Sequence, residues 1–356
     1  MIYGLLMLLS VCSATSDAPE VGTPFSPDEF QGWFDRASEE RTPLPPKVAL
    51  IASKYRYVFV GGFLSERMPS YFAANVRELR AANVSRDAIF QILPSSHESI
   101  DGNAVEVRSR FEDIAARGSE KLVVIAHSRG ACDALAFALK NPEFVRKHVH
   151  AMFLLQGPFG GTLLADYIAG QGSPPDGAMP WRDRAVLSVI GRLEGFYRGR
   201  GKFGGLSEMR RQPSREYWTR LLREHRDAIA IVGPKTFYII AATHPSSLRF
   251  IQRATGSYVH MEDGPNDGVV ALSDQSLPEL GTIVANLIAG HHDLTQARTS
   301  TKETRSYPRA MTHAVLISLA HGQVLPEPAQ NPQPRGDGDR SSGQKRRRAR
   351  LSASTR

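Results

Sequence analysis

The chain has 356 residues, of which 41% are hydrophobic and 22% are charged. These values exclude a disordered, collagen-like or coiled-coil chain and fit one large α/β domain with an insertion. The formal net charge is +8, and residues 181–226 contribute twelve Lys/Arg against five Asp/Glu, while residues 335–356 contribute eight Lys/Arg against two Asp. The remainder is mildly acidic. Basic residues without a recognisable nucleic-acid-binding module give no reason to expect a nucleic acid partner.

The two ends differ from the interior in composition. Residues 3–14 are apolar and end in small residues, so we expect residues 1–16 to be a cleaved export signal of a periplasmic or secreted protein. A lipid anchor on Cys12 is the alternative, which Val11 disfavours. If cleavage follows Cys12, then Cys132 is the only thiol left and no intramolecular disulfide forms. Residues 17–46 are expected to form an N-terminal extension, and residues 325–356, rich in Pro, Gly, Gln and Arg, a disordered basic tail.

Between residues 47 and 322, β-branched runs alternate with stretches of helical periodicity, which predicts a mostly parallel sheet with helices on both faces. Before this region, Ser26 and Glu29 predict a capped helix start. Residues 169–232 interrupt the alternation, are rich in Gly, Arg and aromatics, and are expected to form a helical cap insertion. Strands are expected at residues 47–52, 57–60, 88–93, 121–126, 151–155, 237–240 and 283–288, and helices at residues 70–83, 103–117, 131–140 and 216–228.

A serine stands where the apolar run 121–126 meets the next helix. Small residues lie two positions before and two positions after it, in Ala126-His127-Ser128-Arg129-Gly130. A tight strand-to-helix turn needs small flanking residues, and its strained backbone lifts the serine hydroxyl above the sheet. We therefore predict that Ser128 is a nucleophile. His127, directly before it, is expected to pack in the turn.

A serine hydroxyl at neutral pH needs a histidine base, and that histidine needs a carboxylate to fix its tautomer. The turn-rich segment 264–270 offers Asp267, which we place in a loop just past a strand, and Asp263 is the fallback acid. Two adjacent histidines, His291 and His292, follow the expected strand 283–288. The residue pattern alone leaves open which of them is the base.

Acyl transfer also needs N–H donors aimed at the oxyanion of the tetrahedral intermediate. The backbone N–H of Arg129, directly after the nucleophile, is the first candidate. A second comes from the end of an early strand, where Gly61-Gly62 carries no side chains and lets the backbone approach the site. The next residue, Phe63, is therefore the second expected donor.

Taken together, these segments resemble the α/β-hydrolase superfamily, and more narrowly its bacterial triacylglycerol lipase and esterase branch. The resemblance covers about residues 47–300 and rests on three segments: the turn at Ser128, the loop Asn266-Asp267-Gly268-Val269-Val270, and residues 156–166, which are similar to the Gly-x-Pro-His-x-Gly-Ser-x-x-Ala-Asp segment of these lipases. The chain departs from the family pattern at three positions, where Phe159 and Gly61 replace histidines and Ala126 replaces a glycine.

The resemblance implies a particular choice of base and a limited possibility of metal binding. The spacing His-x-Asp, from His291 to Asp293, recurs in the family and favours His291 over His292. Some relatives hold calcium through the equivalent aspartate, which makes Asp293 a metal-ligand candidate, but no second ligand is identifiable. We therefore expect no metal and no cofactor.

The resemblance and the motifs together predict a serine hydrolase that cleaves carboxylic esters, with lipid or other esters as substrates. The alternatives are phospholipid deacylation, polyester depolymerisation or acyl transfer by the same Ser-His-Asp triad, or a non-catalytic binding protein on a hydrolase scaffold. The basic cap and tail suggest an anionic membrane surface as a further partner.

Overall fold

The computed structural model of the protein describes residues 25–40, 43–172, 179–198, 204–296 and 300–321. The expected export signal with Cys12 and the expected basic tail from residue 325 lie outside these ranges. Within them, no helix is long and apolar enough to cross a membrane.

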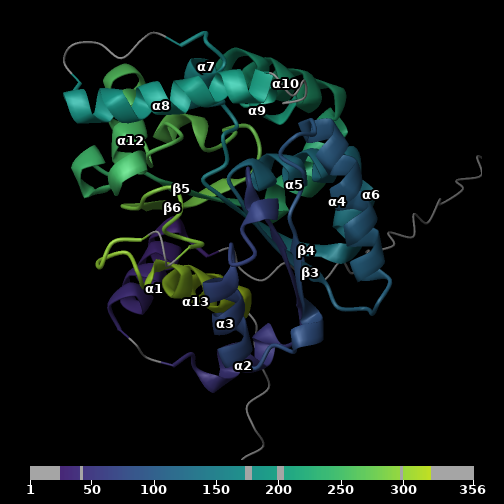
Figure 1. Ribbon diagram of the computed structural model, residues 1–356. Coiled ribbons are helices and arrows are strands. Elements are labelled where there is room, and N and C mark those ends of the chain that lie inside the picture. Colours follow the sequence, from purple (N-terminus) through teal and green to yellow (C-terminus); the bar gives the residue numbers. More distant parts are fainter. Residues whose placement is uncertain (1–24, 41–42, 173–178, 199–203, 297–299, 322–356) are drawn as a thin grey trace, which may run out of the picture. The chain divides into compact units, whose positions relative to one another are not determined.

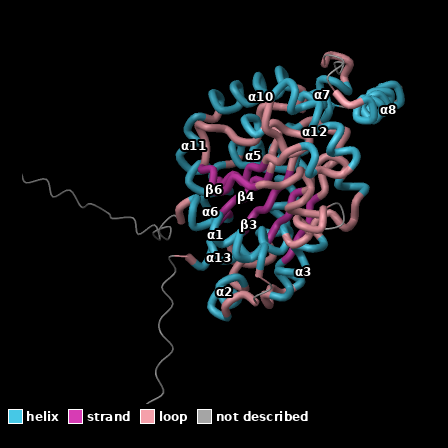
Figure 2. The backbone as a smooth tube through the Cα atoms, turned by 90° about the vertical axis from the view of Figure 1, so that its left-hand side faces the viewer, coloured by secondary structure: helices cyan, strands magenta, loops and turns pink. Residues whose placement is uncertain are grey.

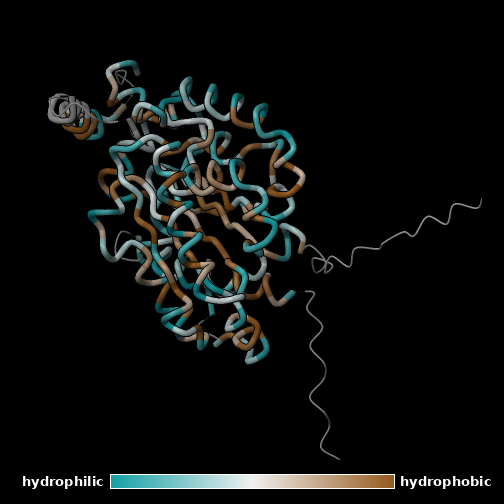
Figure 3. Tube along the Cα trace, turned by 90° about the vertical axis from the view of Figure 1, so that its right-hand side faces the viewer, coloured by the Kyte–Doolittle hydropathy of each residue, from teal (hydrophilic) through white to brown (hydrophobic). Residues whose placement is uncertain are grey.

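A sheet of six parallel strands forms the centre of the protein, in the order β2-β1-β3-β4-β5-β6. All residues of β1 and β3 are buried, as expected for strands covered on both faces. The brown interior of Figure 3 follows these apolar runs. The strands are β1 (Arg56–Val60), β2 (Ile89–Ile92), β3 (Leu122–His127), β4 (Val149–Leu155), β5 (Thr236–Ala241) and β6 (Thr282–Leu287).

Helices cover both faces of the sheet, so the predicted layered architecture is confirmed (Figures 1 and 2). One group, at the bottom of Figure 1, packs around α13. The other group packs around α5, which leads directly out of the central strand β3. The first group is α1 (Pro27–Glu39), α2 (Pro46–Ala52), α3 (Ala73–Ala81) and α13 (Tyr307–Ala320), and the second is α4 (Ile100–Ala115), α5 (Arg129–Lys140), α6 (Pro142–His148) and α11 (Arg226–Val232).

In the described residues between β4 and β5 there are five α-helices, four of them within the expected cap range. In Figure 1, α7, α8 and α10 form the top of the molecule together with α12 (Phe250–Asp263). The expected helix 216–228 is two helices, because the first ends at Glu224 and the next begins at Arg226. The bounds of the first four helices of this region are α7 (Leu163–Ile168), α8 (Trp181–Arg198), α9 (Gly204–Glu208) and α10 (Arg211–Glu224).

The first helix begins as the sequence predicts. The Ser26 hydroxyl accepts a hydrogen bond from the Glu29 N–H, and the Glu29 carboxylate accepts one from the Ser26 N–H. This reciprocal capping box satisfies two backbone donors that a helix start would otherwise leave free.

The prediction of a strand at residues 47–52 is wrong, because these residues lie in α2. Pro46 stands at the first turn, where its missing N–H costs nothing and its fixed φ favours a helix. Val48, Ile51 and Ala52 are buried while Leu50 is 57% exposed. Burial at spacings of three and four is the period of a helix, whereas a strand would bury every second side chain.

Gly130 tests how closely α5 packs on the sheet. A Cβ built on Gly130 lies 2.6 Å from the carbonyl oxygen of Val60, so Gly130→Ala must push α5 away from β1. We expect the free energy of unfolding, measured in urea, to fall by about 1–3 kcal/mol. The matched control is Gly32→Ala in α1, whose added Cβ meets only the end of the Arg36 side chain at 3.6 Å. The control should be neutral or stabilising by up to about 1 kcal/mol, and equal losses in both variants would contradict the close packing.

Candidate active site

Ser128 occupies the turn between β3 and α5, as predicted. Its backbone has φ 55° and ψ −133°, in the left-handed half of the map that a residue with a side chain rarely adopts. The side chain is almost enclosed, with 7% of the residue exposed. The Ser128 N–H donates to the Leu155 carbonyl at the end of β4, which anchors the turn to the neighbouring strand.

Three residues that are far apart in the sequence meet at this turn. His291 Nε2 lies 2.9 Å from Ser128 Oγ, and His291 Nδ1 lies 2.7 Å from Asp267 Oδ2. His291 follows β6, at the end of a strand, as expected. Asp267 does not follow a strand, because α12 separates its loop from β5. The carboxylate therefore enters the site from the end of a helix.

The Asp267 carboxylate is fully buried and accepts four hydrogen bonds. Oδ1 accepts from the N–H groups of Val269 and Val270 at 3.0 and 2.8 Å. Oδ2 accepts from His291 Nδ1 and from the Gln156 amide at 3.0 Å. The Asp267 carbonyl also accepts the His291 N–H at 2.7 Å, so acid and base hold each other through side chain and backbone.

Gln156 is a site residue that the sequence analysis did not single out. It follows β4 with φ 50°, a positive value that a residue other than glycine rarely adopts. Its amide bridges Oδ2 of Asp267 and, at 3.3 Å, the Gly290 carbonyl in the loop of His291. The printed sequence carries no signal for this role beyond the position of Gln156 at the end of a strand.

The two alternative site residues have other surroundings. No hydrogen bond of the described residues joins the His292 ring to Ser128 or to Asp267. Burial lowers the pKa of His292 to about 3, with His291 adding to the effect, so this imidazole is neutral and a poor proton acceptor. Asp263 forms an ion pair with Arg211 at 2.9 Å and does not contact the site.

Asp293 shapes the loop that carries His291. Its carboxylate accepts the Gly290 N–H at 2.8 Å across a tight turn. Burial raises the pKa of Asp293, while the bond from Gly290 opposes this shift. Among the residues that the structure describes, no group of three or more His, Cys, Asp or Glu side chains is placed to hold a metal ion.

The loop after β1 passes directly beside the nucleophile. A Cβ built on Gly62 lies 2.7 Å from Ser128 Cβ and 2.9 Å from Tyr71 Oη, so only glycine fits there. The Gly62 carbonyl accepts the Ser65 N–H at 3.1 Å, which leaves the Phe63 N–H on the opposite side of the same peptide plane. In the described part of the chain, no hydrogen bond engages the backbone N–H of Phe63 or of Arg129.

The Arg129 side chain ties the turn to the cap and to the loop before α4. Its guanidinium donates to the carbonyls of Ser95 and Glu98 and lies 3.9 Å from the Asp133 carboxylate. A Cβ built on Gly205 in α9 would lie only 2.1 Å from Arg129 Nη1, so α9 packs directly on this guanidinium and leaves no room for a side chain there. Burial raises the pKa of Asp133 to about 7, although Arg129 and Asn103 oppose the shift.

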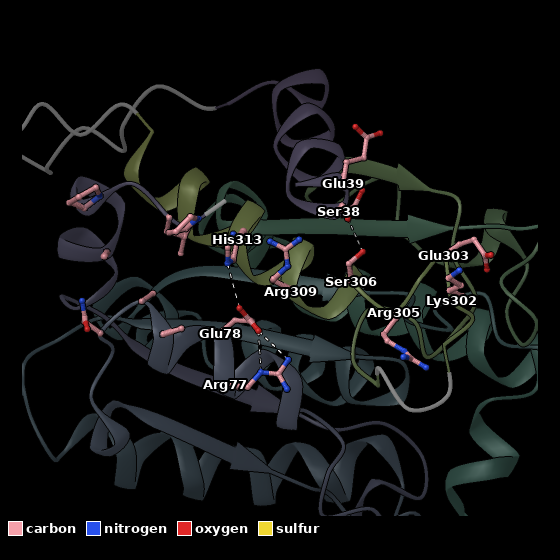
Figure 4. Close-up of a pocket in the computed structure, with 17 residues that line it drawn as sticks. Ser38, Glu39, Arg77, Glu78, Lys302, Glu303, Arg305, Ser306, Arg309 and His313 are labelled. Atoms are coloured by element: carbon pink, nitrogen blue, oxygen red, sulfur yellow. Dashed lines mark hydrogen bonds and ion pairs between the residues drawn. The ribbon is translucent and has the colours of Figure 1, made fainter. Parts of the chain in front are cut away.

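Three surface cavities lie away from this cluster, and none of them is lined by Ser128, Asp267 or His291. The first, of about 900 Å³, lies among α1, α2, α3 and α13 (Figure 4). In its wall, Glu78 forms an ion pair with Arg77 at 3.2 Å and lies 3.7 Å from His313 Nε2. Arg309 is engaged by the carbonyls of Ala37 and Glu40, at the end of α1. None of the residues that line this cavity contacts Ser128, His291 or Asp267, so the cavity takes no part in the proposed reaction at Ser128.

Asp133→Asn tests the burial of the carboxyl group behind the turn. Because its pKa is raised, the native state keeps a proton that the unfolded chain releases between about pH 4 and pH 7. The wild-type free energy of unfolding should therefore fall as the pH rises through this window, by at most about 1.4 kcal/mol per pH unit. Urea unfolding at several pH values should show that the variant lacks this slope, and parallel curves would contradict the assignment.

Comparisons with known proteins support the fold. No family model and no curated sequence matches the chain. Among solved structures, a metagenomic carboxyl esterase has a TM-score of 0.53 at 18% identity, over 75% of this chain and 76% of that chain. The mature form of a Bacillus licheniformis lipase has a TM-score of 0.51 at 16% identity, over 76% of this chain and 93% of that chain. The parallel sheet, the turn at Ser128 and these similarities show that the chain has the α/β-hydrolase fold.

Proposed function

We propose that this protein is a serine hydrolase of carboxylic esters, with Ser128, His291 and Asp267 as its catalytic triad. The observation that carries the proposal is the pair of hydrogen bonds that joins the three side chains, at 2.9 Å and 2.7 Å. The position of Ser128 on a strained strand-to-helix turn supports it further, because this turn presents the hydroxyl to a substrate above the sheet.

In the first half of the reaction, Ser128 Oγ forms a bond to the ester carbonyl carbon while its proton passes to His291 Nε2. Asp267 keeps the Nδ1 proton of His291 in place and stabilises the imidazolium that forms. The tetrahedral intermediate then expels the alcohol, whose oxygen takes the proton from His291 Nε2. The product of this half is an acyl group bound to Ser128 and a free alcohol.

In the second half, water replaces the alcohol and the same groups act in the same order. His291 takes a proton from the water as its oxygen bonds to the acyl carbon, and then returns a proton to Ser128 Oγ as the acid leaves. The N–H groups of Phe63 and Arg129 are the proposed donors to the oxyanion in both halves. Such preorganised donors typically contribute about 10²- to 10³-fold each to the rate.

The fold neighbours suggest the substrate class. One is named a carboxyl esterase and one a lipase, so we propose lipid or other carboxylic esters as substrates of this chain. The enclosure of Ser128 and the contact of α9 with Arg129 support a cap that limits access to the site. On this view the residues of the cap select the acyl group.

Ser128→Ala should abolish hydrolysis of p-nitrophenyl esters, with a loss of kcat of about 10³-fold or more, because no other described hydroxyl is hydrogen-bonded to His291. Far-UV circular dichroism and the urea midpoint should stay close to wild type. The matched control is Ser53→Ala, an exposed serine at the end of α2 whose hydroxyl donates to the Leu50 carbonyl, away from the site. Full activity of the Ser128 variant would contradict the assignment of the nucleophile, whereas failure of a fluorophosphonate to label Ser128 in the wild type would favour a non-catalytic binding protein.

Separate replacement of the adjacent histidines identifies the base. His291→Ala should lose kcat to a similar extent as Ser128→Ala, because the proton of Ser128 then has no acceptor. His292→Ala should keep kcat within about tenfold of wild type, since no hydrogen bond links its ring to the triad residues in the described structure. The reverse pattern would overturn the choice of His291. Adding an alcohol and measuring the ratio of ester to acid products then separates acyl transfer from hydrolysis.

A further inference from the structure

A buried pair of hydrogen bonds joins Tyr71, which lies against the loop after β1, to the loop of His291. A Cβ built on Gly62 would lie 2.9 Å from Tyr71 Oη, so the tyrosine hydroxyl packs directly on this loop. Tyr71 Oη lies 2.6 Å from His127 Nδ1, and His127 Nε2 lies 2.6 Å from the His291 carbonyl oxygen. Tyr71 and His127 are both almost completely enclosed. His127 was expected only to pack in the turn, and Tyr71 was not singled out.

The direction of both protons in this chain follows from the His291 carbonyl at its end. A carbonyl oxygen only accepts, so His127 Nε2 carries the proton and donates it to His291. Burial, with His291 and His292 nearby, holds the pKa of His127 well below its usual range, so the ring is neutral and Nδ1 is an acceptor. The Tyr71 hydroxyl therefore donates to Nδ1, and no other arrangement of the protons satisfies both the His291 carbonyl and the neutral ring.

The two ends of this chain contact two parts of the proposed site. The backbone of His291 is held on both sides of its Cα, because its N–H donates to the Asp267 carbonyl and its carbonyl accepts from His127. At the other end, the Tyr71 hydroxyl packs against Gly62, whose carbonyl accepts the Ser65 N–H. The Gly62 carbonyl belongs to the peptide whose N–H is that of Phe63. The position of Tyr71 therefore limits the movement of the proposed oxyanion donor.

We propose that Tyr71 and His127 are positioning residues for ester hydrolysis, which together hold the Phe63 N–H and the His291 ring in register with Ser128. This inference rests on the proposed function. Neither residue contacts the reacting atoms, so both act through the groups they hold. The proton transfers of the reaction do not pass through them.

The test begins with Tyr71→Phe, which keeps the ring and its contacts with Phe72 and His127 and removes only the hydroxyl. The variant leaves His127 Nδ1 without its donor and removes the hydroxyl that packs against Gly62. We expect kcat for p-nitrophenyl esters to fall about 10- to 100-fold with KM within about twofold, because displaced groups affect the transition state more than substrate binding.

The matched control is Tyr57→Phe. Tyr57 is also completely buried, and its hydroxyl makes a hydrogen bond of 3.0 Å to the Ala52 carbonyl, at the opposite end of β1 from Gly62. Both variants should lose a similar amount of stability in urea, about 1–2 kcal/mol. Only the Tyr71 variant should lose kcat. A wild-type kcat in Tyr71→Phe, or equal losses of kcat in both tyrosine variants, would overturn the proposal.

Two variants of His127 separate positioning from packing. In His127→Gln an amide N–H can still donate to the His291 carbonyl, whereas His127→Leu has no donor. We expect the Gln variant to keep a higher kcat than the Leu variant at matched stability, and equal values would contradict the proposal. Fluorophosphonate labelling of Ser128 distinguishes the two levels of failure. If the wild type is not labelled, the proposed function fails. If the wild type is labelled and Tyr71→Phe is labelled at the same rate, only the positioning role fails.

Discussion

The close contact between α5 and the end of β1 is the constraint on which the candidate site depends. Val60 and Ala126 are paired neighbours in β1 and β3, and Gly130 lies one turn beyond, against the Val60 carbonyl. Without a side chain at Gly130, the chain can turn from strand to helix within Ser128 alone. The conformation of Ser128 costs on the order of 1–3 kcal/mol, which the enclosed strands and α5 around it offset.

The parallel direction of the strands explains why the other groups of the site converge. All six strands are parallel, so their carboxyl ends lie at one edge of the sheet. The loop with Gly62 leaves β1 there, Ser128 leaves β3, Gln156 leaves β4 and His291 follows β6. Buried polar groups at this edge need partners, since an unpaired group costs about 1–3 kcal/mol. The bonds among these loops meet that need and at the same time fix the positions of the proposed catalytic groups.

The sequence was sufficient for the parts of the fold that depend on local pattern. The strands that contain Val58, Val124 and Phe153 were predicted correctly, because an apolar, β-branched run between two stretches of helical periodicity is typical of a buried strand. The same rule failed at Val48, where an apolar run after a proline is a helix with one exposed side. The roles of Tyr71 and Gln156 could not be read, because each depends on a contact with a residue more than 50 positions away.

Long-range pairing also changes the meaning of the charge distribution. The sequence assigns an excess of seven positive charges to residues 181–226, but Arg211 is paired with Asp166 and Asp263, and Arg215 with Asp274. These three carboxylates come from outside that range, so the field above the cap is weaker than the count of its own residues implies. Surface pairs of this kind contribute little to stability. They tie α10 to Asp166 in α7, to Asp263 at the end of α12 and to Asp274 in η5 (Leu272–Asp274). A count of charge along the chain therefore overstates the net charge that this region presents, because part of it is neutralised by carboxylates from other segments.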